Sequence, residues 1–118
     1  TRENKNKTVL EELEILLNDY IASGRLIDSI LPTSEYCASE LGLSVPYFND
    51  LLKFETGKTL DEYFRLKRLE VAKRMLLNTK NTPTIIARQL GYPNVQYFTL
   101  LFKRITGVAP SEYRYSQN

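Results

Sequence analysis

A segment of the chain occurs twice, and this repeat constrains the fold more than any other feature of the sequence. Residues 41–64 read LGLSVPYFNDLLKFETGKTLDEYF, and residues 90–114 read LGYPNVQYFTLLFKRITGVAPSEYR. The Leu-Gly pairs of the two copies lie 49 positions apart and the Tyr-Phe pairs 50 apart, so the second turn holds one additional residue. In each copy a short helix leads to a Leu-Gly turn and a second helix follows, which is typical of a helix-turn-helix. The sequence therefore predicts two helix-turn-helix lobes.

Helix start and stop signals predict the remaining elements. Thr8 and Glu11 form a capping box at the start of an amphipathic helix that reaches about Ile21, and Gly24 follows as a stop. A second capping box at residues 59–62 opens a long helix that extends to about Leu77. Residues 25–31 are expected to connect elements, with Leu26, Ile27, Ile30 and Leu31 folding inward. No strand-like alternation bounded by turn signals occurs, so the predicted fold is all-α: two helix-turn-helix lobes joined by a long linker helix, with an extra N-terminal helix.

The predicted recognition helices have clear boundaries. Ser44 and Asn94 are suitable N-caps, and Gly57 and Gly107 follow the last helical residues, which predicts helices over residues 45–56 and 95–106. Thr33 and Thr82 are the corresponding N-caps of the first helix in each motif, and residues 110–113 are expected to form a short closing helix.

These signals predict a division of the chain into four parts: 1–7, a flexible tail or linker; 8–58, the N-terminal helix plus the first lobe; 59–78, the linker helix; 79–118, the second lobe. The tail is inferred from a polar stretch without apolar anchors. Because the first residue is not methionine, the chain is expected to be the C-terminal fragment of a larger protein.

Composition excludes several classes of site. The chain has one cysteine, Cys37, and no histidine, so neither a disulfide framework nor a Cys/His zinc site is expected, and no metal or other cofactor is predicted. Cys37 is interpreted as a small buried hydrophobic residue. No apolar run of about 18 residues occurs, which predicts no membrane span and a cytoplasmic protein. Without histidine, an exposed thiol or paired carboxylates, no catalytic residue and no enzyme activity are expected.

Charge is distributed unevenly along the chain. Residues 1–62 hold 6 Lys and Arg against 12 Asp and Glu, a balance of −6, while residues 63–118 hold 10 against 2, a balance of +8. A basic C-terminal half favours contact with nucleic acid, although basic residues can also simply solvate helix faces.

Taken together, the repeated pattern with YF, FK, TG and EY at fixed spacing resembles the AraC/XylS family of bacterial transcription regulators over about Thr33 to Arg114. The stronger match is carried by Tyr97, Phe98, Phe102, Lys103, Gly107, Pro110, Tyr113 and Arg114. The resemblance implies sequence-specific binding of double-stranded DNA for regulation of transcription, with one helix of each lobe in successive major grooves. It also implies further partners: RNA polymerase, or an effector or sensor domain N-terminal to these residues.

Side chains that point outward from the first two turns of each recognition helix are the candidates for base contact. They are Val45, Pro46, Asn49, Asp50, Val95, Gln96, Thr99 and Leu100. Amide side chains can bond adenine bidentately, apolar groups can meet a thymine methyl, and an aspartate can accept from a cytosine amino group. The Tyr-Phe pairs are expected to face the core rather than stack on bases.

A second set of residues is suited to phosphate because its members are cationic or carry a hydroxyl near a helix end. These candidates are Ser44, Lys53, Thr56, Lys58, Arg65, Arg68, Lys103 and Arg104. Asp50 and Leu100 stand where a common family pattern has arginine. Asp50 has an alternative role, an ion pair with Lys53 one turn on, in which case the first lobe would read little sequence. The competing function is a helical adaptor that binds a protein.

Overall fold

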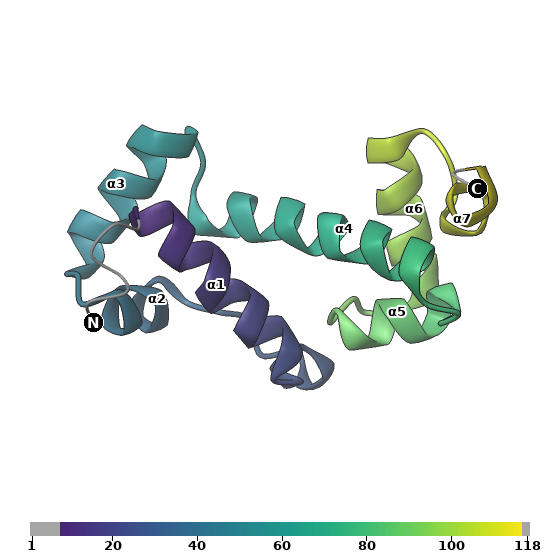
Figure 1. The fold of residues 1–118 in the computed structure, drawn as a ribbon, viewed down its shortest axis with the longest axis horizontal. Helices are drawn as coiled ribbons and strands as arrows, with labels where there is room; N and C mark the ends of the chain where they lie inside the picture. Colours follow the sequence, from purple (N-terminus) through teal and green to yellow (C-terminus); the bar gives the residue numbers. More distant parts are fainter. Residues whose placement is uncertain (1–7, 117–118) are drawn as a thin grey trace. The chain divides into compact units, whose positions relative to one another are not determined.

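The computed structural model describes residues 8–116, and every regular element within this range is a helix (Figure 1). The elements are α1 (Val9–Ala22), the 3₁₀ turn η2 (Arg25–Asp28), α2 (Ser34–Leu41), α3 (Val45–Thr56), α4 (Leu60–Asn78), α5 (Pro83–Gln89), α6 (Val95–Thr106) and α7 (Pro110–Ser116). The all-α prediction is confirmed, and α3 and α6 have the predicted bounds. The expected tail at residues 1–7 lies outside the described residues.

The chain divides into two compact units. Within the described residues, the first unit comprises 8–23 together with Leu31–Phe64, and the second comprises Gly24–Ile30 together with 65–116. Helix α4 begins in the first unit and continues in the second as one uninterrupted helix. No helix between residues 8 and 116 is long and apolar enough to cross a membrane.

The core of the first unit is formed by α1, α2, α3 and the start of α4. The Thr8 hydroxyl accepts a hydrogen bond from the Glu11 N–H at 3.1 Å, so the predicted cap opens α1. Helix α1 packs on α2, and the ring of Tyr20 meets the ring of Tyr36 edge-on at 5.5 Å. The buried apolar side chains here include Leu13, Leu17, Tyr20, Cys37, Ala38, Phe48, Leu52, Leu60 and Phe64.

The second unit is built on a row of aromatic rings. Tyr92 lies 5.0 Å from Phe98, Phe98 lies 5.7 Å from Phe102, and Phe102 lies 5.3 Å from Tyr113 between ring centroids. Pairs at these separations are favourable beyond their buried area. The row joins the turn after α5 to α6 and α7.

Arg114 closes the second unit by holding the end of α4. Its guanidinium donates hydrogen bonds to the carbonyl oxygens of Leu76 (2.7 Å), Thr79 (3.2 Å) and Asn81. The Leu76 carbonyl belongs to the last turn of α4, whose carbonyls lack partners inside the helix, and Thr79 and Asn81 lie in the loop that follows.

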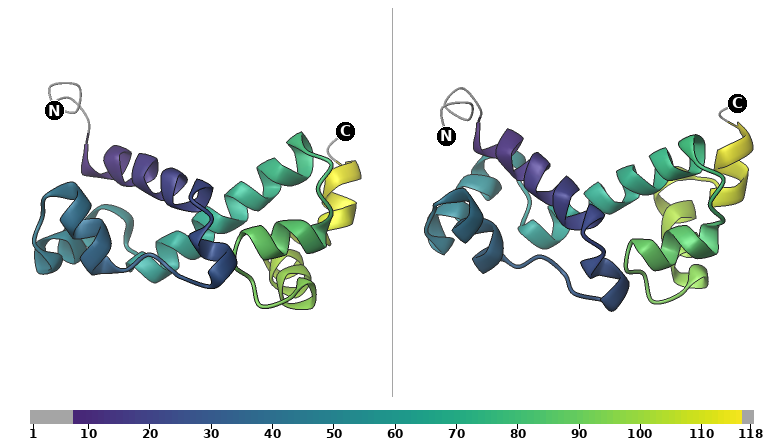
Figure 2. Two further views of the ribbon diagram at one scale, coloured as in Figure 1. Left: turned by 90° about the horizontal axis from the view of Figure 1, so that it is seen from below. Right: turned by 60° about the horizontal axis from the view of Figure 1, so that its bottom comes forward.

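The η2 turn packs against α5 within the second unit (Figure 2). Leu26 is fully buried, but Ile27, Ile30 and Leu31 are exposed, so the prediction that all four fold inward was wrong for three of them. The physical reason is the tight 3₁₀ turn and the left-handed backbone of Ser29 (φ 62°), which present only one side chain to the core.

Candidate nucleic-acid interface

The first helix-turn-helix consists of α2, the turn after it and α3. Gly42 adopts a left-handed conformation (φ 72°), and the Leu43 N–H donates to the Ala38 carbonyl at 2.8 Å, which closes the turn. The Ser44 hydroxyl then caps α3 by accepting from the Tyr47 N–H at 3.3 Å. Phe48 is buried and fixes the rotation of α3 about its axis.

Burial of Phe48 and Leu52 leaves the opposite face of α3 in solvent. Pro46, Asn49 and Asp50 are exposed, and Val45 is half-buried. Lys53 is exposed on the same face, because positions 46, 49, 50 and 53 follow helical spacing. The structure therefore brings the predicted residues of the first unit together on one surface.

The second helix-turn-helix, formed by α5 and α6, repeats this arrangement. The Asn94 Oδ1 caps α6 by accepting from the Tyr97 N–H at 2.7 Å, and Phe98 and Phe102 are fully buried. Four of the predicted residues are exposed: Gln96, Leu100, Lys103 and Arg104. Val95 and Thr99 are half-buried at the edge of the same face.

The two tyrosines that precede the buried phenylalanines do not enter the core. Tyr47 is 56% exposed and Tyr97 is 51% exposed, so the prediction that both members of each Tyr-Phe pair face inward was wrong for the tyrosines. Consecutive helical residues are turned by about 100° from each other. When the phenylalanine points into the core, the tyrosine must lie on the flank of the helix beside the predicted base-contact residues.

The phosphate candidates differ in their freedom to contact a ligand. Arg65, Lys103 and Arg104 are exposed, and Lys58 is half-buried. No ion pair joins Asp50 to Lys53 or to any other residue of the described part of the chain, so the aspartate carboxylate is not neutralised by the lysine.

Arg68 is held within the second unit. Its Nη1 donates to the Leu90 carbonyl at 3.0 Å, and its guanidinium carbon lies 4.6 Å from the centre of the Tyr92 ring. Burial lowers the pKa of Arg68, partly opposed by the neighbouring tyrosines. These interactions hold the Arg68 side chain against the second unit, and its contact with phosphate remains a prediction.

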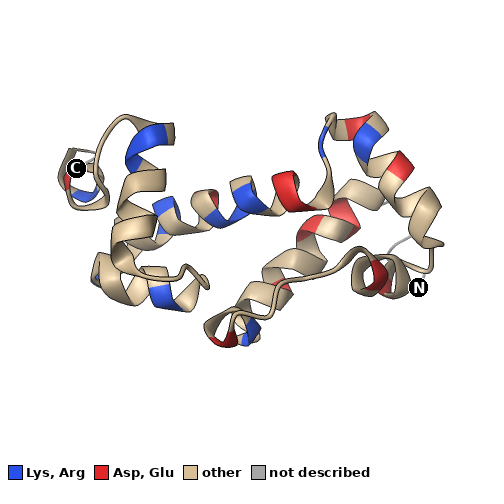
Figure 3. Ribbon diagram, turned by 180° about the vertical axis from the view of Figure 1, so that it is seen from behind, with Lys and Arg blue, Asp and Glu red and all other residues tan. Residues whose placement is uncertain are grey.

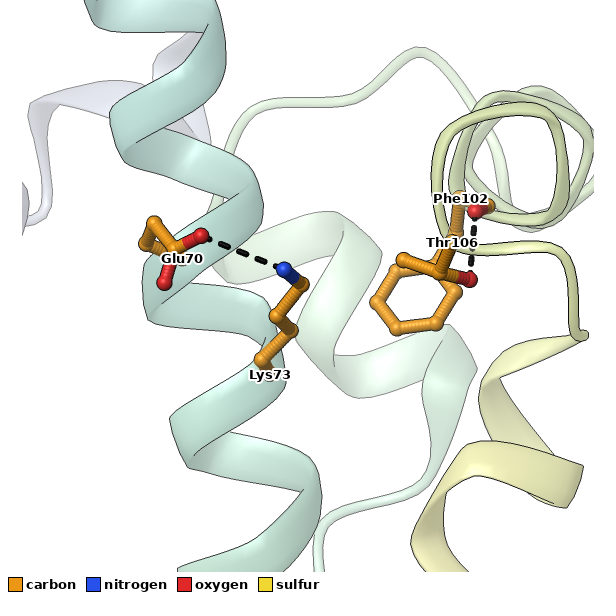
Figure 4. A network of polar contacts seen from close by, with 4 residues as sticks. All are labelled: Glu70, Lys73, Phe102 and Thr106. Carbon is orange, nitrogen blue, oxygen red and sulfur yellow. Dashed lines mark hydrogen bonds and ion pairs between the residues drawn. The ribbon is translucent and has the colours of Figure 1, made fainter.

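The threonine hydroxyls at the C-terminal ends of α3 and α6 also form hydrogen bonds within their own helices. The Thr56 hydroxyl donates to the Leu52 carbonyl at 2.7 Å, and Thr106 donates to the Phe102 carbonyl at 2.8 Å in the same way. Figure 4 shows the Thr106 bond beside the ion pair of Glu70 and Lys73, whose carboxylate oxygen and ammonium nitrogen are 3.2 Å apart. The Thr56 oxygen also accepts from the Lys58 N–H at 3.1 Å, so the hydroxyl both donates and accepts within the chain, and its contact with phosphate remains a prediction.

Sequence reasoning missed the residues that η2 brings to α6. A hollow of about 470 Å³ in the second unit is lined by Ile27 and Ser29, by Arg88 of α5, and by the first turn of α6 including Gln96. Contacts between such distant residues leave no periodic pattern in the sequence. A glycine after the leucine does not reveal them either, because a Cβ at Gly91 would lie 2.7 Å from the Leu26 carbonyl oxygen, whereas one at Gly42 in the matching turn would meet nothing within 4 Å.

Charge follows the division into units. Basic residues are spaced along α4 beyond Phe64 and on α5 and α6, whereas most acidic residues lie on α1, α2, α3 and the start of α4 (Figure 3). The exposed residues of α6 include Lys103 and Arg104, and those of α3 include Asp50 and Lys53. The second unit is thus better suited to a polyanion.

Two helix-turn-helix units, each with an exposed polar face on its second helix, define a DNA-binding protein of the helix-turn-helix class. A helix-turn-helix domain model matches residues 37–116, which is more than half of the chain. The chain belongs to the AraC/XylS family of transcription regulators, as a DNA-binding domain of the AraC type.

The relatives agree with this assignment. The chain is 40% identical over 68 residues to YobQ, an uncharacterised HTH-type transcriptional regulator of Bacillus subtilis, covering 58% of this chain and 28% of YobQ. It is similar to the C-terminal domain of the two-component response regulator yesN from Fusobacterium nucleatum, with 32% identity and a TM-score of 0.61 over 84% of this chain and 94% of that domain. The DNA-binding domain of the transcriptional factor AdpA, solved in complex with a target DNA, shares the fold with 20% identity and a TM-score of 0.61 over 85% of this chain and 90% of that domain. The chain spans about a quarter of the length of several curated relatives that it matches.

Proposed function

We propose that the chain regulates transcription by placing α3 and α6 in successive major grooves of one DNA duplex. The observation that carries this proposal is the presence, in a single chain, of two capped helices whose outward faces hold Asn49 and Gln96 while their phenylalanines are buried. The AdpA domain, which shares this fold, was solved with a target DNA. Because the two reading faces differ, the duplex should carry two unlike elements about one helical turn apart.

Each exposed residue has a role that follows from the chemistry of base edges. Gln96 is suited to adenine, and Leu100 and Thr99 are suited to a thymine methyl group. Asp50 accepts from a cytosine amino group, and its uncompensated charge restricts the first unit to sites where such a donor is present. Lys103, Arg104 and Lys53 bind phosphates and contribute affinity for any sequence.

The complete protein is proposed to carry its signal-receiving domain outside these residues, since the chain spans only part of the relatives it matches. RNA polymerase is the proposed partner through which DNA binding affects transcription, and the cytoplasm is the proposed location. We assign no enzymatic reaction to the chain.

The decisive experiment is selection from a randomised duplex pool near physiological salt, followed by sequencing of the bound DNA. Two unlike elements about 10 base pairs apart would show that both units read sequence. Enrichment of a single element would show that only one unit recognises DNA sequence. No enrichment, together with no salt-dependent duplex binding, would refute the proposal and favour a protein-binding adaptor.

Substitutions on α6 then distinguish base-specific recognition from sequence-independent attraction to phosphate. Gln96→Ala should relax the preference at one base pair, whereas Lys103→Ala should weaken binding to all duplexes and flatten the salt slope by roughly one unit. Lys73→Ala is a matched control, because it removes the same charge from an ammonium already paired with Glu70. Equal loss on every duplex from Gln96→Ala would contradict the base contact.

A further inference from the structure

A hydrogen bond between two helices controls the direction of the Asn49 side chain. The Ser34 hydroxyl, on the first residue of α2, donates to the Oδ1 of Asn49 on the exposed face of α3, with 2.9 Å between the oxygens. Both residues belong to the first unit. The bond therefore links α2, which carries no candidate base-contact residue, to Asn49, a candidate base-contact residue of α3.

The chemistry of the amide makes this direction important. Bidentate bonding of adenine needs the asparagine oxygen to accept from N6 and the nitrogen to donate to N7, with both atoms facing the base edge. The oxygen and nitrogen occupy separate arms of the amide plane. When Oδ1 faces Ser34, only the Nδ2–H groups can be turned toward a base.

We propose that Ser34 determines the base preference of the first unit by holding Asn49 as a hydrogen-bond donor, so that this unit favours guanine over adenine at the base pair Asn49 contacts. Guanine presents only acceptors, N7 and O6, at its major-groove edge, whereas adenine presents a donor beside its acceptor. Ser34 is thus a positioning residue, acting through Asn49. This inference rests on the proposed DNA-binding function and names a specificity determinant of the same site.

The surroundings of the pair support this role. Ser34 is itself anchored, since Thr33 caps α2 by accepting from the Tyr36 N–H at 3.0 Å. A hollow of about 390 Å³ beside the pair is also lined by Lys53 and Asp61.

The second unit cannot form an equivalent pair. The position that corresponds to Ser34 is occupied by Pro83, which has no side-chain donor, and Thr99 stands where the first unit has Asn49. The proposed role of the Ser34–Asn49 hydrogen bond therefore belongs to the first unit alone. It gives the two repeats different base preferences although their backbones are similar.

The test uses the whole chain and four duplexes that differ only at the base pair whose discrimination is lost in Asn49→Ala. The unsubstituted chain should prefer guanine. Ser34→Ala, at a half-buried position in the first turn of α2, should shift the guanine-to-adenine affinity ratio toward adenine by about tenfold, the size of one good base contact. Ser34→Thr retains the hydroxyl and should restore the guanine preference.

A merely structural role for Ser34 would weaken binding to all four duplexes equally and leave the ratio unchanged, which would overturn the inference. Preference of the unsubstituted chain for adenine, or no discrimination lost in Asn49→Ala, would also overturn it. Asn49→Asp gives an independent arm, because it keeps an acceptor for Ser34 but removes the donor, and guanine preference should disappear. The effect of Gln96→Ala on the element read by α6 tests the proposed function separately.

Discussion

Replacing Gly91 with alanine should break the packing of η2 in the second unit. Gly91 has a φ of +79°, and a Cβ there would lie 2.7 Å from the Leu26 carbonyl oxygen and 3.2 Å from the Leu26 Cβ. That carbonyl also accepts from the Ser29 N–H at 2.9 Å, so it cannot turn away without loss. Because the clashing oxygen belongs to the backbone, relief of the clash requires η2 to move as a whole.

The equivalent turn of the first unit provides a matched control. Gly42 has a φ of +72°, but a Cβ there would meet nothing within 4 Å. Both substitutions carry the cost of a left-handed conformation, about 1–2 kcal/mol. Only Gly91→Ala adds a clash that displaces the fully buried Leu26, which contributes roughly 1–3 kcal/mol more. The expected difference in the free energy of unfolding between the two variants is therefore about 1–3 kcal/mol.

Urea unfolding followed by circular dichroism measures both variants, and amide hydrogen exchange locates the change. Gly91→Ala should lose protection at the Ser29 and Ile30 amides, which donate to carbonyls of η2. Gly42→Ala should leave those amides protected. Equal loss of stability in the two variants, with η2 protected in both, would refute the reasoning that Gly91 is required by close approach of Leu26.

Three further predictions concern single side chains. Arg114→Ala should lower the free energy of unfolding by about 2 kcal/mol, since three carbonyls lose a charged donor; Tyr115→Ala, at a residue 74% exposed, should change thermal stability little. Burial raises the pKa of Cys37 to about 11, so iodoacetamide at pH 8 should leave the thiol unmodified until urea unfolds the chain, and rapid native labelling would contradict its burial. Burial raises the pKa of Tyr92 to about 12, whereas an unfolded tyrosine ionises near pH 10, so the unfolded chain loses its proton first and stability should fall between pH 10 and 12. Tyr92→Phe should reduce this alkaline loss and leave stability near pH 7 almost unchanged, because the Tyr92 hydroxyl has no hydrogen-bond partner; an unchanged pH profile would show that Tyr92 does not titrate abnormally.

The local features of the fold could be predicted from sequence because they depend on neighbouring residues. Ser44, Thr82 and Asn94 each accept from the N–H three residues on, as their positions before an apolar run indicated. The bounds of α3 and α6 follow from these caps and from the glycines after them. The exposed candidates Asn49 and Gln96 follow from helical periodicity, which also explains why an exposed face accompanies each buried phenylalanine.

Burial of whole aromatic pairs could not be predicted from type and spacing. Tyr47 and Tyr97 have the apolar character of core residues, but the rotation of each helix is decided by the side chain that best fills the space beneath it. In both units that side chain is the following phenylalanine. Only the packed structure settles which of two adjacent aromatic residues is inside.

By itself, the sequence determined the two repeated helix-turn-helix motifs, their caps and the family to which the chain belongs, because all of these reside in short-range patterns. The tertiary structure alone decided that η2 packs in the second unit through Leu26 and Gly91, and that Ser34 holds the amide of Asn49. Those contacts join residues that are far apart along the chain, and their formation depends on the shape of a core rather than on any local preference. Helix capping acts between residues within one helical turn, so it can be predicted from neighbouring residues. Tertiary packing joins residues from any part of the chain, so it depends on the folded structure.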